Sequence, residues 1–343
     1  MKKFLFVLMA LLVSVSLFAG GGKEEGAAAQ KITIKVGDNW GASHPVAAAL
    51  DKVFKTEIEK GIPGATVDIY HSGTLGNEAD LWNGARNGTI EVAIVGTPFN
   101  QEWSQGNISD WPFLYRDVDH AKKVWSSPIA DELNTSFHQR FPEVYMLAWG
   151  PNSARTFTSN KPLTKFEDFK GQKFRMPGNP IHVGIAEGVG ASAQVIPLGE
   201  LFSALETGVV DGQDNGMVTV ISEAFYEVQK YVYETNHIIA TLEIVVNAKF
   251  LDSLPASAQT VIKNAAKATM AAAWDNYIAE LASERDFLKS KGVTVTACDA
   301  ANQAKIQAAI KPLTDKLLAG QPPFAADIAS WAPATIERIK NVK

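Results

Sequence analysis

The chain has 343 residues, of which 46% are hydrophobic and 20% are charged, and it carries a formal net charge of −5. This length favours two domains, and this composition is that of an ordinary globular protein rather than a disordered one. The acidic balance gives no reason to expect nucleic acid as a partner. The single cysteine, Cys298, excludes both an intrachain disulfide and a cysteine-cluster metal site.

The N-terminus is typical of an exported protein. Lys2 and Lys3 precede an apolar run over residues 4–19, and a small, polar stretch without periodicity follows over residues 20–30. We expect a signal peptide at 1–19 and a flexible lead-in at 20–30. The run is shorter than the roughly 20 residues of a membrane helix, although an uncleaved anchor is the alternative. No cysteine lies nearby, so lipid attachment there is excluded, and we expect a periplasmic protein.

The elements that follow predict a mixed α/β fold. In residues 31–39, Ile32, Ile34 and Val36 alternate with polar residues, as in a half-buried strand. Further strands are expected at residues 65–73, 91–96, 144–150, 172–178, 194–197, 209–215 and 240–250. Helices are expected at residues 44–58, 76–87, 200–206 and 218–226. Another is expected within residues 119–141, and one more runs through residue 186, after the strand at 172–178. Because strands and helices alternate, we expect parallel strands joined by crossover helices.

The last hundred residues predict one very long helix and two shorter ones. Residues 256–291 contain no proline or glycine and are rich in good helix formers. Such a helix would be about 50 Å long, enough to bridge two lobes. A coiled coil is the alternative, but the apolar positions keep no strict heptad. Residues 299–343 predict two further helices, interrupted at Pro322 and Pro323.

No catalytic or cofactor motif is present. The chain lacks HExxH, GxxxxGK[ST] and GxSxG, and its six histidines show no helical ligand spacing. We therefore expect no metal, no cofactor and no enzyme activity, although two of the 37 acidic residues could still pair in space. Two lobes, export and a bridging helix instead favour a protein that closes a cleft on a solute.

Polar side chains at strand ends are the candidates for such a cleft. Asn39 and Trp40 follow the first strand, where a simple turn is the alternative. Arg155 follows the strand at 144–150, and Arg175 lies between Phe174 and Met176 on another. A guanidinium can bind a carboxylate through two hydrogen bonds, but an exposed arginine or an internal ion pair would explain either residue as well. Asn215 ends the strand at 209–215 and could equally cap the next helix.

These segments resemble the solute receptors of tripartite ATP-independent periplasmic (TRAP) transporters, of the dicarboxylate and sialic-acid receptor (DctP) type. The resemblance rests on GQKFRMPGNP, PLGELFSALETGVVDGQDN and FYEVQKYVYETNH between residues 171 and 237, in the family's order. Weaker matches are LGNEADLWNGARNGTIEVAIV, WPFLYRDVDHA and VVNAKFLDSLPASAQTVI. The resemblance covers residues 31 to about 310.

The resemblance implies a role for each candidate. Arg175 stands where the family's arginine pairs with the solute carboxylate, Arg155 matches a second arginine, and Asn215 matches an asparagine that bonds the same carboxylate. Asn39 and Glu78 fall at positions that contact polar parts of the solute. Gly96 and Thr97 match another cleft position, where some receptors carry an acidic residue instead of Gly96. Leu198 replaces an aromatic residue, and Trp40 is bulkier than the family's residue there.

The resemblance also implies an architecture and partners. We expect a Venus-flytrap fold with residues 31–152 and 241–280 in one lobe and residues 153–240 and 281–343 in the other. We expect a monomer that carries a small organic acid to two integral membrane subunits. The candidate solutes are a C4-dicarboxylate, a sugar acid, a keto acid and a hydroxy acid. The polar side chains of Asn39, Glu78 and Asn215 slightly favour a hydroxylated solute such as the sugar acid. An exported sensor and an exported enzyme with paired carboxylates are the alternative functions.

Overall fold

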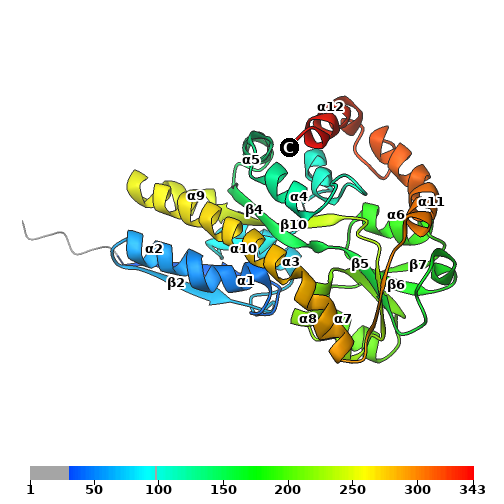
Figure 1. Ribbon diagram of the computed structural model, residues 1–343. Coiled ribbons are helices and arrows are strands. Elements are labelled where there is room, and N and C mark those ends of the chain that lie inside the picture. The colour runs from blue at the N-terminus through cyan, green and yellow to red at the C-terminus, as the bar shows by residue number, and fades with distance from the viewer. Residues whose placement is uncertain (1–30, 97–98) are drawn as a thin grey trace, which may run out of the picture.

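The computed structural model describes residues 31–96 and 99–343. Figure 1 shows two sheets side by side, flanked by helices, with the long helix α10 lying across the molecule. The expected signal peptide and lead-in lie outside the described residues. No helix in the described part of the chain is long and apolar enough to cross a membrane.

The first sheet has the strand order β2-β1-β3-β10-β4. Its strands are β1 (Ile32–Gly37), β2 (Ala65–Tyr70), β3 (Val92–Val95), β4 (Val144–Ala154) and β10 (Ile239–Asn247). β1 is parallel to β2 and β3, whereas β10 is antiparallel to both of its neighbours. Helices of this region are α1 (Pro45–Ala49), a π-helical turn (Leu50–Phe54), α2 (Lys55–Gly61), α3 (Glu78–Asn87), α4 (Val118–Trp125), α5 (Pro128–Arg140) and α9 (Ala248–Asp252).

The second sheet has the order β11-β9-β5-β8-β6-β7. Its strands are β5 (Thr156–Ser159), β6 (Lys173–Met176), β7 (Ser192–Val195), β8 (Gly212–Asn215), β9 (Tyr231–Glu234) and β11 (Thr294–Ala297). β5 is antiparallel to both β8 and β9. The helices near it are α6 (Pro180–Gly188), α7 (Leu198–Glu206) and α8 (Met217–Ser222).

The expected mixed α/β fold is confirmed, with three corrections. Both sheets are mixed rather than parallel, because β10 and β5 enter them antiparallel. The helix expected within 119–141 is two helices, since Ser127 caps a new helix whose first residue is Pro128. The strands β5, β9 and β11, of four residues each, were not predicted.

The chain passes between the two sheets at three places. β4 ends at Ala154 and β5 starts at Thr156, β9 ends at Glu234 and β10 starts at Ile239, and α10 (Ala256–Ser290) contacts α1 at one end and β11 at the other (Figure 1). The prediction of a long bridging helix is therefore confirmed. Its buried residues, from Ala258 to Tyr277, recur every three or four positions along one face.

The two helices expected after residue 299 are also present, as α11 (Ala300–Leu318) and α12 (Ile328–Lys340). α11 packs on α6, whereas α12 returns to the 3₁₀-helix Ser104–Asp110. Arg338 of α12 forms an ion pair with Glu132 of α5, with Nη2 and Oε1 2.7 Å apart. The last two helices thereby contact elements next to both sheets, α6 beside the second sheet and α5 beside the first.

Candidate functional site

Two adjoining cavities lie between the two sheets, one of about 30 Å³ and the other of about 290 Å³. Glu78, Arg175, Pro177 and Leu198 line both of them. Trp40, Arg155 and Asn215 line the smaller, inner cavity, and Asn39 lines the outer one. Seven of the eight candidates from the sequence thus face one composite cleft. The eighth, Thr97, lies outside the described residues.

Arg175 is held in the cleft by the alternation of its strand. Phe174 and Met176 are fully buried in the core, so Arg175 between them points the other way. Its Nε donates to the carbonyl oxygen of Ile196 at 2.7 Å. Neither Nη atom has a hydrogen-bond partner among the residues that the structure describes, although the side chain is only 4% exposed. Burial, and then repulsion by Arg155, lower the pKa of Arg175 to about 10, so it stays charged at neutral pH.

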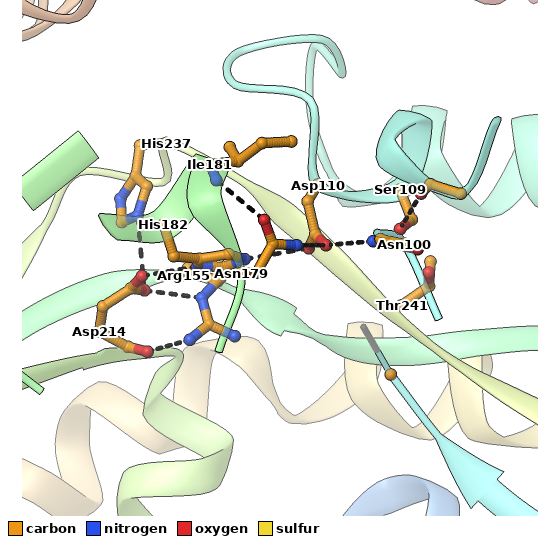
Figure 2. Close-up of polar contacts among 12 residues, drawn as sticks. Asn100, Ser109, Asp110, Arg155, Asn179, Ile181, His182, Asp214, His237 and Thr241 are labelled. Atoms are coloured by element: carbon orange, nitrogen blue, oxygen red, sulfur yellow. Dashed lines mark hydrogen bonds and ion pairs between the residues drawn. The ribbon is translucent and has the colours of Figure 1, made fainter. Parts of the chain in front are cut away.

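Arg155, in contrast, is paired with a carboxylate. It occupies the single residue between β4 and β5, and its Nε donates to Asp214 Oδ1 at 2.6 Å. Its Nη2 donates to the carbonyl oxygen of the same aspartate. Burial alone would raise the pKa of Asp214, but Arg155 together with His237 and His182 holds that pKa well below its usual range. Figure 2 shows Arg155 directed at Asp214.

A buried network continues from Asp214. The ring of His182 lies between two carboxylates, with Nδ1 2.9 Å from Asp214 Oδ2 and Nε2 3.2 Å from Asp110 Oδ1 (Figure 2). Asn100 and Asn179 both donate to Asp110 Oδ2 at 2.9 Å. Burial and Arg155 oppose a positive charge on His182, but the carboxylates of Asp110 and Asp214 have the larger combined effect and raise its pKa. These contacts fix Arg155 in place before any solute arrives.

Glu78 and Asn215 bring polar groups to the cleft from opposite sheets. Glu78 is the first residue of α3, where the capping box of Asn77 and Asp80 starts the helix, and its Oε1 accepts the N–H of Gly96 at 2.7 Å. Burial raises the pKa of Glu78 against the opposing effects of Gly96 and the arginines. The Nδ2 of Asn215, the last residue of β8, donates to Gln213 Oε1 at 2.7 Å. The alternative role of Asn215 as a helix cap is wrong, because Gly216 occupies that position.

Trp40 and Leu198 supply apolar surface. The backbone N–H of Trp40 donates to Asp38 Oδ1 at 2.9 Å, so the side chain of Asp38 stabilises the turn after β1. Trp40 is 3% exposed and lies beside His44, with ring centroids 5.9 Å apart. Leu198 opens α7 at the other side of the cleft. Both residues restrict the space beside the arginines.

Three further residues of the cleft were not among the predicted site residues, namely Asn152, Pro177 and Ala240. Asn152 is the most informative, since its Oδ1 is buried without a hydrogen-bond partner within the described residues. A usable signal was present, because Asn152 comes two residues after the strand expected at 144–150, although β4 in fact continues to Ala154. The anchoring role of Asp214 was not predicted either.

The arrangement suits an anion. Arg155 is paired with Asp214, whereas both Nη atoms of Arg175 can still donate hydrogen bonds to a ligand. A bound anion would stabilise Arg175, because a buried charge without a partner is unfavourable. No group of three or more histidine, cysteine, aspartate or glutamate side chains suited to a metal ion occurs in the described residues. The charged chemistry of the cleft therefore comes from the two guanidinium groups and Glu78.

Comparison with known proteins is consistent with this site. A TRAP periplasmic solute-binding protein from Haemophilus influenzae, solved with L-gulonate bound, is 32% identical with a TM-score of 0.84; the match covers 91% of this chain and all of that one. The sugar acid-binding protein DctPAm from Advenella mimigardefordensis, in complex with galactonate, is 25% identical with a TM-score of 0.85, over 91% and 99% of the two chains. The 2,3-diketo-L-gulonate-binding periplasmic protein YiaO of Escherichia coli is 32% identical over 66% of this chain and 69% of its own.

The family model of the bacterial extracellular solute-binding proteins, family 7 (DctP), matches residues 36–321. This range contains every residue of the cleft named above, from Asn39 to Ala240. The resemblance to TRAP receptors is thereby confirmed, and the chain belongs to the bacterial extracellular solute-binding proteins of family 7.

Proposed function

We propose that this protein is the periplasmic receptor of a TRAP transporter and captures a small sugar-acid anion. The observation that carries the proposal is Arg175, a buried guanidinium whose two Nη atoms face the cleft without a partner in the described part of the chain. A solute carboxylate would accept both hydrogen bonds and neutralise the charge. Hydrogen bonds to charged groups contribute roughly 1.5–3 kcal/mol each.

The other cleft residues divide between the two ends of the solute. Arg155 and Asn215 would support the carboxylate beside Arg175, since the three line the same inner cavity. Glu78, Asn39 and Asn152 offer oxygen acceptors for hydroxyl groups. Trp40 and Leu198 would pack against the carbon chain, and the role of Thr97 stays a prediction from the resemblance.

A hydroxylated monoanion fits the charge of the cleft better than a dicarboxylate. The cations that line it are Arg155, which is already paired with Asp214, and Arg175. A second carboxylate would approach Glu78, and like charges at close range repel. The proteins reported above with gulonate, galactonate and diketogulonate as ligands support an open-chain sugar acid.

Export and delivery complete the proposal. We propose that residues 1–19 are removed as a signal peptide, and that residues 31–152 with 241–280 close on residues 153–240 with 281–343 around the solute. The receptor, acting as a monomer, then passes the solute to two membrane subunits and catalyses nothing. A rise in sugar-acid uptake when the receptor is added to vesicles that hold those subunits would test delivery.

A thermal-shift screen tests the solute class directly. The panel contains aldonates, uronates, C4-dicarboxylates, short monocarboxylates and neutral sugars, and we expect aldonates to give the largest rise in Tm. The bound acid should be recovered unchanged, whereas turnover would support an enzyme. Stabilisation by neutral sugars alone would contradict the carboxylate site.

A further inference from the structure

A third cavity, of about 450 Å³ and separate in its lining from the cleft, lies where the chain crosses between the sheets. It is lined by Ala154 at the end of β4, by Ile239 at the start of β10, and by Tyr277 and Glu284 of α10. All three connections between the sheets therefore border it (α10 is labelled in Figure 1). Its volume is in the range of small-molecule sites.

Glu284 is the unusual residue of this cavity. Its side chain is only 5% exposed, and neither carboxylate oxygen has a hydrogen-bond partner in the described structure. A buried carboxyl group without partners is costly in either protonation state, and more so when charged. Burial, followed by Glu280, raises the pKa of Glu284 to about 8, against the opposing effect of Arg285.

The neighbouring cations are already engaged elsewhere. The Nε of Arg285 donates to Glu234 Oε1 at 2.7 Å. Arg116 donates to the carbonyl oxygens of Lys340 and Val342 at 2.9 and 2.8 Å. The other titratable groups along the walls are acidic or phenolic, namely Asp117, Asp119, Tyr115 and Tyr277. None of these groups forms a hydrogen bond with Glu284 in the described structure.

We propose that this cavity is a second binding site, which takes a small organic cation of the alkylammonium class with Glu284 as its counter-ion. A metal ion suits the site poorly, because a hard cation needs several oxygen ligands and no cluster of three such side chains occurs among the described residues. An ammonium group on an apolar body needs one carboxylate and apolar or aromatic walls, which Leu281, Ile239 and Tyr115 provide.

The test uses isothermal titration of the mature protein with cyclohexylammonium and with cyclohexanol, its neutral analogue of nearly the same shape. We expect saturable one-to-one binding of the ammonium and none of the alcohol. Glu284→Gln should weaken ammonium binding at least tenfold, whereas Glu280→Gln, an exposed change one turn earlier on α10, should leave it within twofold. Equal binding of the alcohol, or full affinity in Glu284→Gln, would overturn the proposal.

The pH dependence adds a second readout. Below about pH 8 Glu284 carries a proton, which an ammonium ligand must displace, so binding should release a proton and strengthen with rising pH up to that value. An alkylammonium resembles the lysine side chain, whose pKa is about 10.4, and stays charged over this range. If ethyl-, cyclohexyl- and benzylammonium all fail to bind at millimolar concentration, the cavity holds only water and the proposal is wrong.

Discussion

The cleft and the cavity lined by Glu284 each bury an ionisable group, one basic and one acidic, without a carboxylate or cation bonded to it among the described residues. In the cleft, Arg175 faces empty space beside Arg155, which Asp214 already neutralises. In the other cavity, Glu284 is buried without a hydrogen-bond partner in the described structure, beside Arg285, which is bound to Glu234. The paired groups, Arg155 with Asp214 and Arg285 with Glu234, stabilise the fold. The unpaired groups, Arg175 and Glu284, are the ones that we propose bind ligands.

Breaking a paired charge should have the largest effect. In Asp214→Ala, Arg155 becomes a second buried cation without a carboxylate, and the rings of His182 and His237 lose the neighbouring negative charge. We expect a loss of about 3–5 kcal/mol in the free energy of unfolding. Urea denaturation measures it, with Glu132→Gln as the control, since that change breaks an exposed ion pair worth below about 1 kcal/mol. Equal losses in the two variants would refute the distinction between them.

Removing the unpaired cation of the cleft should cost binding rather than folding. For Arg175→Ala we expect sugar-acid affinity to fall at least tenfold, which is about 1.4 kcal/mol. Lys173→Ala is the matched control, because it removes the same charge two residues earlier on β6 from an exposed position. Titration calorimetry compares the two variants, and full affinity in Arg175→Ala would move the site elsewhere.

Removing the ionisable carboxyl group of Glu284 should stabilise the protein, in a pH-dependent way. The raised pKa of Glu284 means that the folded state holds a proton that the unfolded state gives up, so stability falls as pH rises from about 4.5 to about 8. Glu284→Gln abolishes this loss, at most about 1.4 kcal/mol per pH unit. The difference in Tm between variant and wild type should therefore grow with pH up to about 8. A difference that stays constant with pH would show that Glu284 is not buried in this way.

The smallest effect is expected from the acceptor in the cleft. Glu78→Gln keeps the shape and the bond from Gly96 but weakens the acceptor for a solute hydroxyl. The cost should be about 1 kcal/mol, or roughly fivefold in affinity. A matched pair of ligands, with and without the hydroxyl group next to the carboxylate, shows whether the loss depends on that hydroxyl.

Most of the helices and strands could be predicted from the sequence, because their periodicity and caps are local. Ile32, Ile34 and Val36 identify β1, and the proline-free stretch identifies α10. The direction of β10 could not be predicted, since it depends on the distant strands β3 and β4. Short strands such as β5 are set by their neighbours rather than by their own four residues.

The candidate cleft was predictable in part, for a related reason. Arg155, Arg175 and Asn215 lie in or next to strands that the sequence predicts. The resemblance to TRAP receptors then assigns each of them a role in binding the solute carboxylate. Their different states could not be predicted, because only folding brings Asp214 to Arg155 and leaves Arg175 without a carboxylate. Glu284 gave no signal at all, since a glutamate on a long helix is ordinarily exposed.

One calorimetric comparison tests the central claim most directly. L-gulonate and D-glucitol differ only in that the alcohol carries CH₂OH where the acid carries its carboxylate, so they share every other hydroxyl group. If Arg175 awaits a carboxylate, the acid should bind one to one and the alcohol should not bind detectably, while Arg175→Ala should remove the difference. Equal binding of both ligands by the wild-type protein would contradict the account.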